Sequence, residues 1–262
     1  MDSSDLKPPA DPIPLVGTIA LMATTVAGFF ILVGPTGFPT DAILTRFALS
    51  ASQPWNLAGY WMLHLGLFHL VSNLVGLLAI GLVLEKVLGS SDYWLIFGLG
   101  AATSGIVYLV VSPSASLAGA SGGIAALIAA SMMVKPLETI RNLAVGAVLV
   151  ALILQPLLVL TVENSLHSIQ RQKDSLQPQI EQAHQNNRPT QERQLQEQFN
   201  QLDSSQKTIQ TSALQDYYKP AIWLPHAIGA LAGSLFILRF RPKAIQPTLN
   251  AIHGYLGKKE KK

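Results

Sequence analysis

Ser121 and His226 are the two residues whose chemistry could break an amide bond. Ser121 lies in the small-residue stretch Gly119-Ala120-Ser121-Gly122-Gly123, and His226 lies at the start of the last apolar run. A serine hydroxyl is a poor nucleophile until a base removes its proton, and a neutral imidazole does this near pH 7. A Gly-x-Ser-Gly motif arises by chance in about one chain in ten of this length. The motif therefore predicts a nucleophile only if other segments bring a base and an oxyanion site to Ser121.

His69 and Asn73 are the best candidates for such an oxyanion site. They are four residues apart in an apolar run and so share one helix face, with His64 five residues before His69. Polar groups in hydrocarbon are costly and usually face the protein interior or a water-filled cavity. A structural hydrogen-bonded pair between helices would explain them equally well. Glu85, which is followed by Lys86, is expected to anchor the structure rather than to act as an acid.

The composition indicates a membrane protein. Only 13% of the 262 residues are charged, against about 25% in an ordinary soluble domain. Apolar runs occur at 14–33, 61–84, 93–111, 119–134, 143–162 and 221–240. Most approach the roughly 20 residues that a helix needs to cross the bilayer, whereas run 119–134 would rise only about 24 Å. We therefore predict an all-α bundle of six transmembrane helices, and no disulfides because the chain has no cysteine.

The distribution of basic residues predicts the orientation of this integral, multi-pass protein. Most Lys and Arg residues lie next to those ends of the apolar runs that share one side of the membrane with the N-terminus, and the cluster 258–262 is also basic. This pattern places both termini in the cytoplasm. The predicted organisation is a polar, disordered cytoplasmic lead (1–13), five core helices (14–162), an external insert (163–218), the sixth core helix (219–241) and a basic cytoplasmic tail (242–262).

The external insert differs in composition from the rest of the chain. Fourteen of residues 164–218 are glutamine. Apolar residues at helical spacing and a turn signal at 186–189 favour a helical hairpin, while the polarity of the segment is equally compatible with a disordered linker. The insert is a candidate contact for a substrate or for another external partner.

Three of the predicted helices enter the membrane from the outside, and this brings the polar residues to one depth. Since run 119–134 is too short to span, Ser121 should lie below the outer surface, level with His69 and Asn73, in a cavity that water reaches. Gly229 and Gly233 could pack against Gly122 and Ala126 and bring His226 to Ser121. No Asp or Glu lies near this level, which predicts a Ser–His dyad rather than a triad.

The ordered set of motifs resembles the rhomboid intramembrane serine proteases. The set is His64-x4-His69-x3-Asn73, Gly81-x3-Glu85, Gly119-Ala-Ser121-Gly122 and His226-x2-Gly229-x3-Gly233. The resemblance implies that Ser121 is the nucleophile, that His226 is the base, and that His69, Asn73 and the Ser121 N–H form the oxyanion hole. His64, Gly119, Gly122, Gly229 and Gly233 would support the site.

The resemblance also implies what the protein acts on. The substrates would be transmembrane proteins cut near the outer side of the membrane, and helix 143–162, with Pro156 as a kink, would be the lateral gate. Lipid is the expected surrounding, in a bacterial-type plasma membrane; no cofactor, metal or nucleic acid is expected.

Three features depart from the rhomboid pattern. Asn56 follows Trp55 where rhomboids often have arginine, and Ala125 occupies the position of an aromatic residue that stacks on the base in some members. His226 must then be oriented by something else, such as Trp223 or helix packing. The insert is unusually long. The alternative functions are an inactive rhomboid-like protein that binds or chaperones membrane clients and, with less support, a small transporter.

Overall fold

The computed structural model describes residues 15–33, 39–215 and 223–259, and these are almost entirely helical. The first half contains α1 (Val16–Leu32), α2 (Asp41–Phe47), the 3₁₀ turns η3 (Pro54–Ala58) and η4 (Tyr60–Met62), α3 (Leu67–Leu88), α4 (Ser90–Val111) and α5 (Ser121–Val134). The second half contains α6 (Pro136–Leu149), the π-helix η5 (Val150–Leu154), α7 (Gln155–Gln185), α8 (Pro189–Gln215), α9 (Trp223–Phe240), the 3₁₀ turn η7 (Pro242–Ile245) and α10 (Gln246–Lys259). The predicted lead 1–13 lies outside the described residues.

Four helical segments of the described chain are long and apolar enough to cross a membrane. They are α3, α4, the continuous α6–η5 segment and α9. The other two predicted runs form shorter apolar helices, α1 with 17 residues and α5 with 14. Within the described ranges the structure is thus an all-helical, multi-span membrane bundle, and four of its helical segments have spanning length.

The helix that carries His69 and Asn73 begins later than the apolar run suggested. The run starts at residue 61, but η4 and an extended segment through Gly66 precede α3, which starts at Leu67. Hydropathy alone does not distinguish helix from buried irregular backbone, and such backbone is tolerated where protein encloses it. His64 therefore lies in this irregular segment, and His69 and Asn73 lie in the first two turns of α3.

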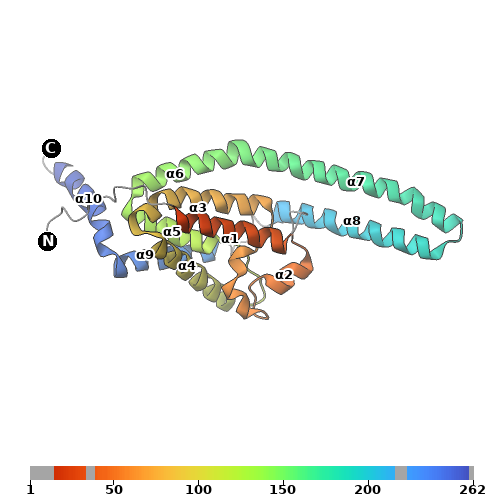
Figure 1. The fold of residues 1–262 in the computed structure, drawn as a ribbon, viewed down its shortest axis with the longest axis horizontal. Coiled ribbons are helices and arrows are strands. Elements are labelled where there is room, and N and C mark those ends of the chain that lie inside the picture. The colour runs from red at the N-terminus through yellow and green to blue at the C-terminus, as the bar shows by residue number, and fades with distance from the viewer. Residues whose placement is uncertain (1–14, 34–38, 216–222, 260–262) are drawn as a thin grey trace.

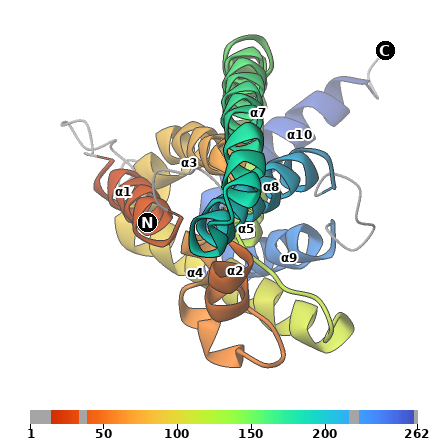
Figure 2. The ribbon, with the colours of Figure 1, turned by 90° about the vertical axis from the view of Figure 1, so that its right-hand side faces the viewer.

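The short helix α5 forms the centre of the bundle. It packs against α3, α4, α6 and α9, and the side chains of Ala126, Leu127 and Ala130 are fully buried. Figure 2 shows α5 inside the ring of longer helices. Because neighbours surround α5, its short length places its N-terminus inside the protein rather than at the lipid surface.

Glu85 is a structural anchor in the described structure. One carboxylate oxygen accepts hydrogen bonds from the Gly17 N–H (2.6 Å) and the Ser90 hydroxyl, and the other accepts from the N–H and hydroxyl of Thr18. No side chain of α1 caps its own N-terminus. Glu85 satisfies these orphan donors, and its negative charge lies at the positive end of the helix dipole.

The basic segment after α9 is a folded element that contacts the bundle. Arg241 makes a two-armed ion pair with Asp92 at the start of α4, and this carboxylate raises the pKa of the guanidinium. The Thr248 hydroxyl of α10 donates to the Val134 carbonyl, the last residue of α5 (2.9 Å). These contacts attach η7 and α10 to the ends of α4 and α5.

The insert is a long helical hairpin in the described residues. α6, η5 and α7 follow one another without a break, and Pro156 lies in the first turn of α7, directly after the π-helix. α7 ends at Gln185, Asn187 adopts a positive φ of 53°, and α8 returns along α7. Figure 1 shows this α7–α8 hairpin projecting beyond the bundle, at the end opposite α10.

Candidate active site

Ser121 is the first residue of α5, and backbone contacts hold the loop that leads to it. The Leu117 and Leu49 backbones exchange two hydrogen bonds (2.8 and 2.9 Å), and the Gly119 N–H donates to the Tyr60 carbonyl (3.1 Å). Tyr60 is itself buried and donates its hydroxyl to the Ala101 carbonyl of α4 (2.7 Å). The position of Ser121 is therefore set jointly by the first loop, by α4 and by α5.

The α5 N-terminus presents backbone donors. Ala120 precedes Ser121, and no described side chain caps this helix end. The first helical bond is donated by Ile124 to Ala120, so the N–H groups of Ser121, Gly122 and Gly123 precede the hydrogen-bonded part of the helix. Such N–H groups, together with the helix dipole, favour negative charge at this point.

Gly119 allows the His69 ring to approach the loop that leads to Ser121. Gly119 has a φ of +108°, a conformation that side chains rarely allow. A Cβ at this position would also lie only 2.5 and 2.8 Å from the Cε1 and Nε2 atoms of His69. Glycine is thus required here for two reasons, and the His69 ring lies directly against the segment that carries Ser121.

The His69 tautomer can be assigned from its backbone contact. The Leu65 N–H donates to His69 Nδ1 across a long 3.5 Å, which makes Nδ1 an acceptor. In a neutral imidazole the other nitrogen then carries the hydrogen. His69 Nε2–H, on the Gly119 side of the ring, is the donor that can face an oxyanion.

His64 orients Asn73 through a relay of two hydrogen bonds. His64 Nδ1 lies 3.2 Å from the Met62 carbonyl, which can only accept, and His64 Nε2 lies 2.9 Å from Asn73 Nδ2. The Met62 carbonyl therefore sets the tautomer in which Nε2 accepts from the Asn73 amide. Asn73 Nδ2 retains a second hydrogen. His64 is fully buried, and its ring centroid is 5.0 Å from that of His69.

Helix α9 approaches α5 at Gly122. A Cβ on Gly229 would overlap the Gly122 carbonyl oxygen, and one on Gly233 would overlap the Ala126 carbonyl oxygen. This is the pairing expected from the sequence: at both positions only the absence of a side chain allows the two backbones to come so close.

A buried serine on α4 holds the first turn of α9. The Ser104 hydroxyl donates to the Pro225 carbonyl (2.6 Å), and Ser104 also lies against Gly122 and Gly229. His226 is therefore placed by the residues on either side of it, Pro225 and Gly229. Trp223 is 63% exposed, so helix packing rather than this aromatic positions the first turn of α9.

The structure brings the predicted residues to one region. His226 lies close enough to His69 to act on it electrostatically, and His69 contacts Gly119, two residues before Ser121. On the other side of Ser121, Gly122 contacts Gly229 of α9, the helix that carries His226.

Two supporting residues have no strong signal in the sequence. Ser104 stands between Gly100 and Gly105 and resembles an ordinary small residue in a helix contact. Asn56 occupies the position where rhomboids often have arginine, yet its amide donates to the carbonyls of Arg46 (2.9 Å) and Ala48 (3.0 Å) at the end of α2. Asn56 thus anchors the first loop with a shorter side chain.

The start of α5 gathers polar groups. The Ser121 hydroxyl, uncapped backbone N–H groups and the His69 imidazole, which lies against Gly119, all belong to this region. No group of three or more His, Asp or Glu side chains within the described ranges has the arrangement needed to hold a metal ion.

Comparisons with known proteins agree with these motifs. The Rhomboid domain family matches residues 51–170, a range that includes His64, His69, Asn73 and Ser121 and ends before His226. Rhomboid-related protein 2 of Mus musculus is 29% identical over 93 residues, which are 36% of this chain and 31% of that protein. Rhomboid protease GluP of Bacillus subtilis (strain 168) is 31% identical over 113 residues, 41% of this chain and 22% of that protein.

A third relative gives the same family. Rhomboid-related protein 3 of Homo sapiens is 32% identical over 81 residues, 31% of this chain and 20% of that protein. The chain spans less than a third of the length of each of these relatives, and no solved structure matches it. The family match over 51–170 shows that this chain contains a Rhomboid domain, and the relatives that it resembles over this region are rhomboid proteins.

Proposed function

We propose that this protein is an intramembrane serine endopeptidase that cleaves transmembrane proteins by a Ser121–His226 dyad. The observation that carries the proposal is the approach of α9 to α5 at Gly122. It brings the helix turn that contains His226 next to the uncapped helix end that begins with Ser121. The Rhomboid domain match over 51–170 supports the same reaction class, and one relative is named as a protease.

The proposed reaction begins with attack of Ser121 Oγ on the scissile carbonyl carbon while His226 takes the hydroxyl proton. The oxyanion accepts hydrogen bonds from the Ser121 N–H, His69 Nε2–H and the second hydrogen of Asn73 Nδ2. His226 then gives its proton to the departing amine, and an ester to Ser121 remains. A water molecule, deprotonated by His226, hydrolyses this acyl-enzyme. Each such oxyanion donor is worth about 3–4 kcal/mol in a comparable acyl-transfer site.

We propose a topology of six membrane segments with both termini in the cytoplasm. The helices α1 and α5 complete the set as short segments that long neighbours enclose, and the basic residues favour this orientation. Because the chain lacks cysteine, single cysteines introduced at Ser3 and at Lys261 can be labelled with an impermeant maleimide. Labelling of both positions only in inverted vesicles is the expected result. The plasma membrane of a bacterium stays our expected location, although the relatives include mouse and human proteins.

We propose that substrates enter beside the α6–η5–α7 segment. The inner half of this segment is fastened: Asn142 donates to the Ala79 carbonyl of α3 (3.1 Å), and Thr139 is hydrogen-bonded to Ser131 of α5 (2.7 Å). The outer half begins at the π-helix η5 and continues through Pro156. Leu152 in η5 and Leu157 in α7 are 72% and 58% exposed. A π-helix lacks regular i→i−4 bonds, so bending at η5 would move the outer half alone.

The decisive experiment compares the wild-type chain with Ser121→Ala, using a fluorophosphonate probe and a reporter transmembrane substrate. Wild type should be labelled covalently and should cleave the reporter; Ser121→Ala should do neither while it unfolds at the same temperature in detergent. Ser131→Ala, on the same helix, is the matched control and should retain labelling. Persistent labelling of Ser121→Ala would refute the nucleophile assignment. A folded wild-type chain that binds the reporter but is never labelled would instead identify a non-proteolytic client-binding protein.

A further inference from the structure

The α7–α8 hairpin has the side-chain pattern of an antiparallel coiled coil. On α7 the inward positions repeat at alternating spacings of three and four residues: Leu166, Ile169, Lys173, Leu176, Ile180 and Ala183. On α8 they are Leu195, Phe199, Leu202, Gln206 and Ile209. All of these side chains are buried or half-buried, whereas most of their neighbours are exposed. We call these inward positions the seam of the hairpin; side chains with this repeat keep two helices in contact along their length.

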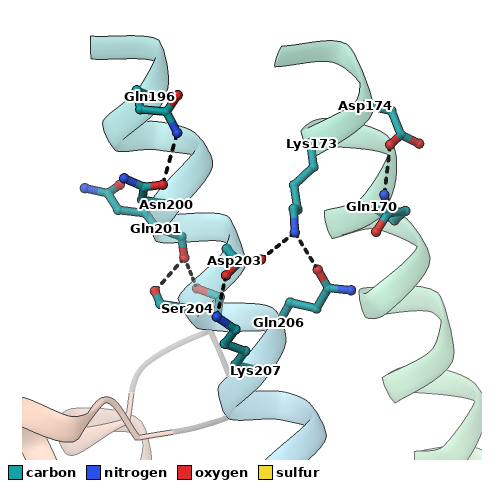
Figure 3. Close-up of polar contacts among 11 residues, drawn as sticks. Gln170, Lys173, Asp174, Gln196, Asn200, Gln201, Asp203, Ser204, Gln206 and Lys207 are labelled. Carbon is teal, nitrogen blue, oxygen red and sulfur yellow. Dashed lines mark hydrogen bonds and ion pairs between the residues drawn. The ribbon is translucent and has the colours of Figure 1, made fainter. Parts of the chain in front are cut away.

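A polar layer interrupts the seam and sets its register. The Lys173 side chain is only 13% exposed, and its ammonium contacts Asp203 (2.7 Å) and Gln206 (3.0 Å). Asp203 also pairs with Lys207 (2.9 Å), and Lys173 lies over the Phe199 ring. Figure 3 shows Lys173 reaching from α7 to Asp203 and Gln206 on α8. Because only one register pairs this buried ammonium, the polar layer defines how the two helices align.

The charged residues of the hairpin avoid one of its two edges. The edge that carries Asp203 also carries Asp174, Glu181, His184 and Lys207. On the other edge, α7 presents Ser165, Ser168, Gln172, Ser175, Gln179 and Gln182. Beside them, α8 presents Gln191, Gln194, Gln198, Gln201 and Ser205. We call this second edge the Gln/Ser face; none of its side chains carries a charge.

A groove lies along the Gln/Ser face. Gln172, Ser175, Gln198, Gln201 and Ser205 form its walls, and Leu176 and Leu202 of the seam are reached at its floor; its volume is about 410 Å³. An isolated two-helix hairpin in water usually carries charges along both edges of its seam, because charges keep such surfaces apart. A charge-free groove over two seam leucines is instead suited to burial.

We propose that the Gln/Ser face binds the same face of a second copy of this chain and forms an antiparallel four-helix bundle outside the membrane. A glutamine amide both donates and accepts hydrogen bonds, so a Gln/Ser surface complements itself. A charged partner would find no counter-charge on this face, and burying an unpaired charge against it is costly. Leu176 and Leu202 of each copy would meet in the middle of the new core.

The size of the face predicts association that depends on the membrane. Residues 165–182 of α7 extend about 27 Å, which with two helices side by side gives roughly 500–600 Å² per copy. Stable interfaces in solution bury about 800 Å² per partner. Two chains held in the same bilayer have a much higher effective concentration. Dimers should therefore form in lipid vesicles and dissociate when detergent dilutes the protein.

The test measures dimer formation of the full chain in liposomes, by energy transfer between labelled copies at several surface densities and without substrate. The variant Gln172→Glu with Gln201→Glu adds four carboxylates to the proposed interface and should weaken dimerisation at least about tenfold. The matched control, Gln177→Glu with Gln196→Glu, makes the same chemical change on exposed positions outside the Gln/Ser face and should leave dimerisation unchanged.

A crosslink reports the geometry of the dimer. Ser175→Cys should be joined between two copies by a short bismaleimide, whereas Gln177→Cys should not.

A chain that stays monomeric at every density, or that dimerises equally well with Gln172→Glu and Gln201→Glu, overturns the proposal. If that variant changes only cleavage of the reporter and the chain is monomeric, the occupant is a substrate segment and the second copy is excluded. Because association is measured without substrate, this result does not depend on the proposed proteolysis.

Discussion

The Ser104 hydroxyl donates a 2.6 Å hydrogen bond to the carbonyl of Pro225, the residue directly before His226. Ser104 is fully buried, and the bond crosses from α4 to the first turn of α9. It holds the backbone on one side of the imidazole, while the close contact of Gly229 with Gly122 holds the other side. These two contacts hold the first turn of α9, which carries His226, in a chain that has alanine at position 125.

Ser104→Ala should therefore impair catalysis more than it impairs folding. Loss of one hydrogen bond costs about 0.5–1.5 kcal/mol of stability, but a small shift of His226, the proposed base, should lower kcat by up to about a hundredfold. KM should change little, since Ser104 is fully buried. Thr103→Ala is the matched control, because the Thr103 hydroxyl donates to the Leu99 and Gly100 carbonyls of its own helix. Equal kinetics for the two variants would contradict the positioning role of Ser104.

His64→Phe should lower activity through Asn73. The substitution keeps a buried ring but removes the acceptor that orients the Asn73 amide. Removal of one oxyanion donor costs about 10²–10³ in kcat, so Asn73→Ala should show that loss and His64→Phe a smaller one. His64→Gln retains an acceptor and should recover part of the activity. The rates of fluorophosphonate labelling of the three variants measure the order of these losses. A fully active His64→Phe enzyme would show that this relay is dispensable.

Gly229→Ala should destabilise the folded protein because its methyl group would overlap the Gly122 carbonyl. Overpacking of this kind costs about 1–3 kcal/mol. Gly98→Ala is the control: it lies in α4, and a Cβ there meets nothing within 4 Å, so it should be neutral or stabilising. Thermal unfolding in detergent measures both. If the two variants unfold at the same temperature, α5 and α9 do not approach as closely as described.

The hairpin should lose stability in strong acid through Asp203. Hydrogen bonds from Lys173 and Lys207 lower the pKa of Asp203 from its ordinary 3.8 to about 2. A depressed folded-state pKa means that the stabilisation is present above pH 3.8 and disappears as the pH falls through 2. Limited proteolysis of the hairpin between pH 5 and pH 2 should show increasing cleavage. In Asp203→Asn this pH dependence should be weaker, with a less stable hairpin at pH 5; an unchanged profile would exclude the contribution of Asp203.

The sequence by itself determined those features that depend on local composition and spacing. Apolar runs predicted the membrane helices, because burial in lipid depends on the length and hydrophobicity of each segment. The short run after Gly119 predicted that Ser121 begins a helix too short to span, and α5 has 14 residues. The i, i+4 spacing of Gly229 and Gly233 predicted a close helix contact.

Tertiary structure decided which distant groups meet, because such contacts depend on the whole packing and leave no local pattern. The start of α3 at Leu67 follows from irregular backbone that the bundle encloses. Ser104 supports Pro225 across 121 residues of sequence, and Asn56 anchors the first loop because the end of α2 folds back onto it. The composition of the insert was compatible with either a linker or a hairpin. In the structure Lys173 of α7 pairs with Asp203 and Gln206 of α8, because the buried ammonium needs partners that the facing helix supplies.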